Sequence, residues 1–168
     1  LAGLPRFDRS SMRAEYPFVH IDLEDTEIPL LVSMEAYTPF IPLNADDSGI
    51  PGAYITYRVK NPLQKPVKVS VAGTLDNPVG FEKYDNFSLV KRVGNCINKY
   101  RHESGLKGIF FCGEDIPDKH IANGSMSLMT TNEHVTVKPV WFQGEWTDGA
   151  EDFWEDFTAD GRLDETSE

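Results

Sequence analysis

The sequence predicts an all-β fold, an antiparallel β-sandwich with one short helix near the C-terminal end. Two observations lead to this prediction. Apolar and polar residues alternate in several short runs that are separated by turn-forming residues, which is typical of half-buried strands. In addition, one stretch only, residues 149–158, combines a helical spacing of apolar side chains with acidic residues near its start. Successive half-buried strands form antiparallel sheets, and each sheet needs a second layer to cover its apolar face.

The alternating runs place the expected strands. In the first run, Val19, Ile21 and Leu23 lie on one side of an extended chain and the polar residues between them lie on the other. Pro39, Pro42 and several turn-forming residues make residues 38–52 a loop. Residues 61–66 form a short link, which predicts a hairpin between the runs on either side. The seven expected strands are residues 17–24, 29–37, 53–60, 67–75, 107–112, 124–130 and 134–138.

The rest of the chain has weaker patterns. Residues 1–16 lack a sustained period and are predicted to be an arm, and residues 81–104 are polar and irregular. Within them, residues 95–101 fit either a short helix or a loop. The helix at 149–158 has Trp154 as its expected buried anchor, and residues 159–168 form an acidic tail. The chain is thus expected to be one sandwich domain, or a fragment of one, with its strands in residues 17–144.

Charge and hydropathy exclude two classes of partner. The net charge is −11, and residues 145–168 carry ten acidic residues against Arg162 alone. An acidic surface repels phosphate backbones, so no nucleic-acid partner is expected. No apolar run approaches the roughly 20 residues that cross a bilayer, so no membrane span is expected. The acidic run is interpreted as a solvated helix and tail and not as a cation site.

Two cysteines bear on the compartment. Cys96 and Cys112 form no CxxC pair and give no disulfide framework, so free thiols are predicted. Free thiols favour a reducing compartment such as the cytoplasm. No basic segment followed by an apolar stretch opens the chain at Leu1, so no secretion signal is predicted.

Several strings in the sequence resemble a known family. They run in the same order as in that family and cover most of the chain: residues 35–43 (EAYTPFIPL), 47–51, 57–62 (YRVKNP), 105–108 (GLKG), 124–131 (GSMSLMTT), 152–157 (DFWEDF) and 160–163 (DGRL). In this order they resemble the N-terminal domain of glycoside hydrolase family 116, which contains bacterial β-glucosidases and non-lysosomal glucosylceramidases.

The resemblance implies a non-catalytic role for this chain. In that family the N-terminal domain is a supersandwich-like β-sandwich, and the two carboxylates that cleave the glycosidic bond lie in a separate (α/α) barrel downstream. The parent protein is therefore expected to be a glycoside hydrolase that acts on a glucoside or a glucosylceramide-like substrate, with further sequence at both ends of this chain. No catalytic residue, cofactor or metal ligand is carried over to any position here, and the expected partner is the downstream barrel of the same polypeptide.

Several polar residues have side chains that could form a site. Glu35 lies in the middle of an expected strand, opposite the apolar side, and is predicted to form a structural ion pair or hydrogen bond. Asp46, Asp47 and Ser48, with Asn44, could offer oxygens to calcium, but they lack the alternating order of a calcium loop and are predicted to cap a turn. The four histidines have no zinc-binding spacing.

Aromatic residues offer one further hypothesis. Trp141 and Trp146 flank residues 142–145 at the end of an expected strand, where core packing or contact with a second domain is favoured over direct contact with a sugar. The alternative function is a stand-alone carbohydrate-binding sandwich that uses these two residues. A third interpretation, a structural or adhesion sandwich without any sugar ligand, is disfavoured by the family resemblance.

Overall fold

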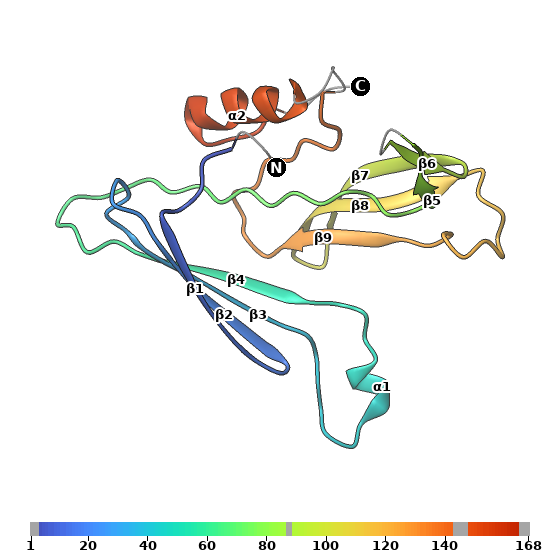
Figure 1. The fold of residues 1–168 in the computed structure, drawn as a ribbon, viewed down its shortest axis with the longest axis horizontal. Helices are drawn as coiled ribbons and strands as arrows, with labels where there is room; N and C mark the ends of the chain where they lie inside the picture. The colour runs from blue at the N-terminus through green and yellow to red at the C-terminus, as the bar shows by residue number, and fades with distance from the viewer. Residues whose placement is uncertain (1–3, 87–88, 143–147, 165–168) are drawn as a thin grey trace. The chain divides into compact units, whose positions relative to one another are not determined.

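The computed structural model describes residues 4–86, 89–142 and 148–164, and they divide into two compact units (Figure 1). The N-terminal unit comprises Pro5–Lys68, and the C-terminal unit comprises Val69–Glu168 together with Leu1–Leu4. The predicted all-β class is confirmed, because antiparallel sheets dominate both units and the longest helix is short and lies near the C-terminal end. This content is consistent with a sandwich-like all-β fold. Among the described residues, no helix has the length and apolar character needed to cross a membrane.

The N-terminal unit is a four-stranded antiparallel meander. Its strands β1 (Arg9–Glu15), β2 (Phe18–Glu24), β3 (Leu31–Tyr37) and β4 (Tyr54–Lys60) follow one another in the sheet in chain order. The one-turn helix α1 (Ala45–Ser48) lies in the loop between β3 and β4. The strands expected at 17–24, 29–37 and 53–60 are therefore confirmed.

The register of this sheet sorts its side chains onto two faces. Met12, Ile21, Met34 and Tyr57 lie opposite one another across the four strands, and so do the positions two residues away in each direction. Side chains of directly opposed residues share a face. We call the face that contains this row the apolar face; its residues are Ser10, Met12, Ala14, Val19, Ile21, Leu23, Val32, Met34, Ala36, Ile55, Tyr57 and Val59.

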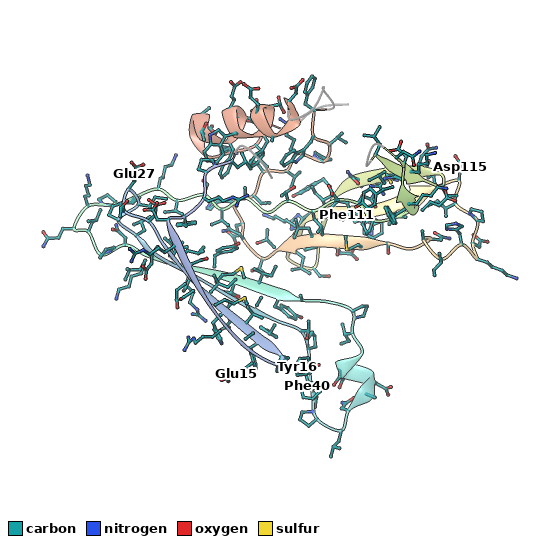
Figure 2. All side chains as sticks on the ribbon, in the orientation of Figure 1. Glu15, Tyr16, Glu27, Phe40, Phe111 and Asp115 are labelled. Carbon is teal, nitrogen blue, oxygen red and sulfur yellow. The ribbon has the colours of Figure 1, made fainter. Side chains whose placement is uncertain are left out.

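The opposite face is polar along most of its length and aromatic at one end. Phe18, Tyr37 and Tyr54 lie opposite one another there, with ring centroids 5.6 Å apart for the first pair and 5.1 Å apart for the second. At the same end of the unit, Tyr16 meets the ring of Phe40 edge-on with 5.1 Å between centroids (Figure 2). Aromatic cross-strand pairs stabilise a sheet beyond their burial.

The C-terminal unit contains two small sheets and a helix. Strands β5 (Phe81–Tyr84) and β6 (Val90–Arg92) form a hairpin, and β7 (Asn95–Glu103), β8 (Leu106–Glu114) and β9 (Met126–Thr130) form a three-stranded antiparallel sheet. Helix α2 (Asp148–Asp160) follows. Phe111 on β8 is 2% exposed and is the most deeply buried large side chain of the described residues (Figure 2).

A buried asparagine links the loop before β5 to the three-stranded sheet. Asn77 is 7% exposed, and its amide nitrogen lies 2.9 Å from Asn98 Oδ1 and 3.1 Å from the carbonyl oxygen of Cys112. Its side-chain oxygen accepts a hydrogen bond of 2.9 Å from the amide of Val79. Asn98 in turn donates to the carbonyl oxygen of Pro139 at 2.7 Å. These bonds satisfy a polar group that would be costly to bury without partners.

The structure corrects five expectations. The segment predicted as an arm, residues 1–16, contains strand β1, whose alternation is hidden because only Met12 is a large apolar residue. Residues 95–101 belong to β7 and are neither helix nor loop, since pairing with β8 overrides their polar composition. Residues 67–75 and 134–138 lie outside strands despite their alternation, so the hairpin expected at 61–66 does not form. Alternation makes a strand only where a neighbouring edge supplies hydrogen bonds.

Candidate functional site

Trp141 packs against helix α2. Its ring stacks on that of Phe153 with 4.9 Å between centroids and 7° between planes, and Phe153 stacks on Phe157 at 5.6 Å. Trp141 is half-buried, whereas Phe153 is only 8% exposed. One face of the Trp141 indole is therefore covered by the helix. The other predicted sugar-binding or interface residue, Trp146, lies outside the described residues.

The helix uses a different anchor from the one expected. The predicted helix at 149–158 is confirmed as α2, with Asp148 and Glu151 in its first turn. Phe153, and not Trp154, is the buried anchor, because Trp154 is 37% exposed. Adjacent residues on a helix point about 100° apart, so two neighbouring aromatic residues cannot both lie at the centre of the buried face.

A lysine near the same helix was missed by sequence reasoning. Lys138 Nζ lies 2.7 Å from Asp152 Oδ2 and 3.2 Å from Asp156 Oδ2, two carboxylates that are one helical turn apart. The Lys138 side chain is 7% exposed. The hydrogen bond to Asp152, supported by Asp156, raises the pKa of Lys138 above its ordinary value against the opposing effect of burial. The acids at i and i+4 were visible in the sequence, but nothing local pointed to a lysine 14 residues earlier.

Glu35 lies where the sequence placed it. Its carboxylate lies 3.5 Å from His20 Nδ1 and 4.0 Å from Arg58 Nη2, on the face opposite the apolar one. The predicted structural ion pair is therefore confirmed. The group is about one-third exposed, and pairs of this kind contribute little to stability.

The acidic turn after β3 caps a helix. Asn44 Oδ1 accepts the amide of Asp47 at 3.1 Å, and Asn44 Nδ2 donates to Asp47 Oδ2 at 2.6 Å. Ser48 Oγ donates to the carbonyl oxygen of Ile41 at 3.0 Å and also accepts the Ile41 amide at 2.9 Å. The predicted capping role of these residues is confirmed. Across the described ranges, no three His, Cys, Asp or Glu side chains gather closely enough to hold a metal ion.

Both cysteines are free thiols, as predicted. In the register of β7 and β8, Cys96 lies opposite Gly113 and Cys112 lies opposite Ile97. The two side chains therefore point to opposite faces of the sheet, which prevents an intramolecular disulfide in this fold.

Two surface depressions can be compared with the needs of a glycosidase site. One is lined by Lys83, Tyr84, Asp85, Asn86 and Lys91, and another by Arg101, Glu103, Ser104, Leu106, Phe110, Ser127 and Met129. Each contains a single carboxylate. Glycoside hydrolysis with retention requires two carboxylates about 5 to 5.5 Å apart. Neither depression therefore has the acid pair of a glycosidase.

Comparison with known proteins identifies the family. No curated protein matches the chain. The family model described as "beta-glucosidase 2, glycosyl-hydrolase family 116 N-term" matches residues 4–168, which is nearly the whole sequence. The resemblance found in the motifs at 35–43, 105–108 and 124–131 is thereby confirmed, and the chain belongs to the N-terminal domain family of glycosyl hydrolase family 116.

Proposed function

We propose that this chain is the non-catalytic N-terminal part of a glycoside hydrolase of the β-glucosidase or glucosylceramidase type. It supports a helical-barrel catalytic domain of the same polypeptide and helps to shape the rim of its substrate cleft. The observation that carries the proposal is the family match over residues 4–168, because an N-terminal domain of this family implies a further catalytic domain in the parent protein. The substrate proposed for the parent is a β-glucoside or a glucosylceramide-like lipid.

The apolar face gives the supporting role a physical basis. Met12, Ile55 and Tyr57 on this face are 67%, 59% and 46% exposed. Four strands of seven residues, spaced about 4.8 Å apart with about 3.4 Å per residue, cover roughly 400 Å². The residues of this face on β2 and β3 are half-buried, and a partly exposed apolar face of this extent is typical of an interaction surface. No charged residue lies on the face, so covering it removes apolar area from water without burying an ion.

The first experiment tests the lack of catalysis. The purified chain is incubated with an aryl β-glucoside beside a buffer blank and the full-length parent enzyme. We expect turnover by the parent and none above the blank by the chain, because the two depressions lack an acid pair. Turnover by the chain that survives repurification would refute a purely supporting role.

The alternative proposal is a carbohydrate-binding module that uses Trp141 and Trp146. Trp141 is half-buried and keeps part of its indole accessible beside Phe153. Calorimetry of the chain against glucosides and cello-oligosaccharides separates the two functions. Saturable heat that is lost in Trp141→Ala supports sugar binding, whereas a supporting domain gives no saturable heat.

A further inference from the structure

Asn123 stands out among the asparagines of this chain by what surrounds its side chain. Six of the others hold a partner through the side-chain amide: Asn44, Asn61, Asn77, Asn95, Asn98 and Asn132. Within the described ranges, the Asn123 side chain has no such hydrogen bond. It is exposed and lies in the loop that leads into β9.

The residue that follows Asn123 is Gly124, whose backbone is open to approach. Gly124 has no atom within 4 Å of the place where a Cβ would lie, so its backbone can be approached from that side. Asn61 and Asn77 are followed by proline, which has no backbone N–H to react. Asn132 is followed by Glu133, whose side chain crowds the same position. Asn86, the remaining described asparagine, precedes residues outside the described ranges. Among the asparagines whose following residue is described, Asn123 therefore combines a side chain without a hydrogen bond and an unhindered backbone amide after it.

We propose that Asn123 is a site of spontaneous deamidation in the folded protein. The backbone nitrogen of Gly124, after losing its proton, attacks Cγ of Asn123. The new N–Cγ bond closes a succinimide ring, the Cγ–Nδ2 bond breaks, and the side-chain nitrogen leaves as ammonia. Water then opens the ring at either carbonyl carbon, which yields aspartate or, when the backbone carbonyl is attacked, isoaspartate. No oxidant, reductant or enzyme is required.

The loop is held firmly on both sides of this site. The carbonyl oxygen of Ala122 accepts the amide of Gly80 at 2.8 Å, and the amide of Asn123 donates to the carbonyl oxygen of His120 at 2.9 Å. On the other side, Met126 is paired with Phe111 in the sheet. Isoaspartate lengthens the main chain by one methylene group between these fixed points and adds a negative charge. The modification should therefore displace the backbone of the loop that leads into β9.

The experiment follows the folded chain in mildly alkaline buffer, where the backbone amide loses its proton more readily. Peptide mass spectrometry measures the conversion of Asn123 from amide to acid over time, with Asn44 and Asn132 as internal controls in the same digest. Labelling by an isoaspartyl methyltransferase distinguishes isoaspartate from aspartate. We expect conversion at Asn123 with both products, and retention of the amide at the two control positions.

The matched variant is Gly124→Ala. It fits the backbone, because Gly124 lies outside the left-handed region and has open space at the Cβ position. An added Cβ hinders ring closure, so conversion should become about tenfold slower. An unchanged rate in Gly124→Ala, a product containing aspartate alone, or equal conversion at Asn132 would each overturn the proposal, since each excludes a ring closed selectively at Asn123.

Discussion

Lys138 donates to Asp152 across 2.7 Å, and this contact ties helix α2 to the segment that precedes it in the C-terminal unit. Asp156 supplies a second carboxylate at 3.2 Å, so the nearly buried ammonium group has partners on two successive turns of the helix. The lysine and the Trp141–Phe153 stack together hold the helix against this segment.

Removing both negative charges should leave the nearly buried ammonium group of Lys138 without a counter-charge. The double variant Asp152→Asn with Asp156→Asn is expected to lower the free energy of unfolding by about 2–4 kcal/mol. Lys138→Met should cost less, since it removes the nearly buried charge itself, while Asp152 is 41% exposed and Asp156 still accepts the amide of Asp164. Urea unfolding followed by circular dichroism measures both. Glu151→Gln, an exposed position on the same helix, is the control.

Alkaline pH should weaken the same contact. The folded-state pKa of Lys138 is raised above its ordinary value of 10.5, so the unfolded chain loses this proton first as pH rises. The contribution of Lys138 to stability is therefore fully present below pH 10.5 and is lost as pH rises through the folded-state pKa. Unfolding measured between neutral and strongly alkaline pH should show a steeper loss for the native chain than for Lys138→Met. Parallel curves would contradict the raised pKa.

Asn77 should be among the most sensitive positions of the C-terminal unit. Asn77→Ala removes the bonds to Asn98 and Cys112 and leaves buried polar groups without partners, which is expected to cost about 2–4 kcal/mol. Asn132→Ala removes one exposed turn bond and should cost well under half of that. Thermal and urea unfolding of the two variants test the difference, and equal losses would contradict the structural role assigned to Asn77.

A lysine substitution should have a larger effect on the apolar face of the N-terminal sheet than on the opposite face. Ile55→Lys places a charge on the apolar face, whereas Thr56→Lys, one residue later on β4, places it beside Glu35 on the opposite face. In the parent enzyme, Ile55→Lys should lower thermal stability and yield, while Thr56→Lys should leave both nearly unchanged. In the isolated chain, Ile55→Lys should reduce self-association in sedimentation experiments. Equal effects of the two variants would argue against a covered apolar face.

Gly108 should tolerate no side chain. It lies on β8 with φ of 156°, and a Cβ there would meet the carbonyl oxygen of Leu128 on β9. Gly108→Ala is therefore expected to destabilise the three-stranded sheet by about 1–3 kcal/mol. Gly52→Ala is the matched control, because nothing lies within 4 Å of its Cβ position. Chemical denaturation of both variants measures the contrast, and loss of stability in Gly52→Ala alone would contradict it.

Five strands with one apolar side are predictable from the sequence, although the same alternation at 67–75 and 134–138 forms no strand. The alternation of Val19, Ile21 and Leu23 predicts β2. The same pattern predicts four more strands, at residues 29–37, 53–60, 107–112 and 124–130. The pattern fails for β7, where the half-buried Asn98 is held by hydrogen bonds to Asn77 and Pro139. Such burial depends on partners that are distant in the chain, so no local pattern reveals it.

The site residues also differ in how far their partners lie along the chain. Glu35 and the Asn44 cap were predicted because their partners lie in neighbouring strands or within one turn. Lys138 was missed because its partners lie 14 and 18 residues away. Phe153 and Trp154 are adjacent, and only the docking direction of the helix decides which of them is buried.

The strand register of the N-terminal meander restricts insertions and deletions within its strands. Met12, Ile21, Met34 and Tyr57 share a face only because each strand keeps its count of residues. Deleting one residue inside β3 would move the apolar side chains beyond the deletion to the opposite face of the sheet and the polar side chains to the apolar face. Substitutions can accumulate in these strands, whereas changes in length are confined to the connecting loops.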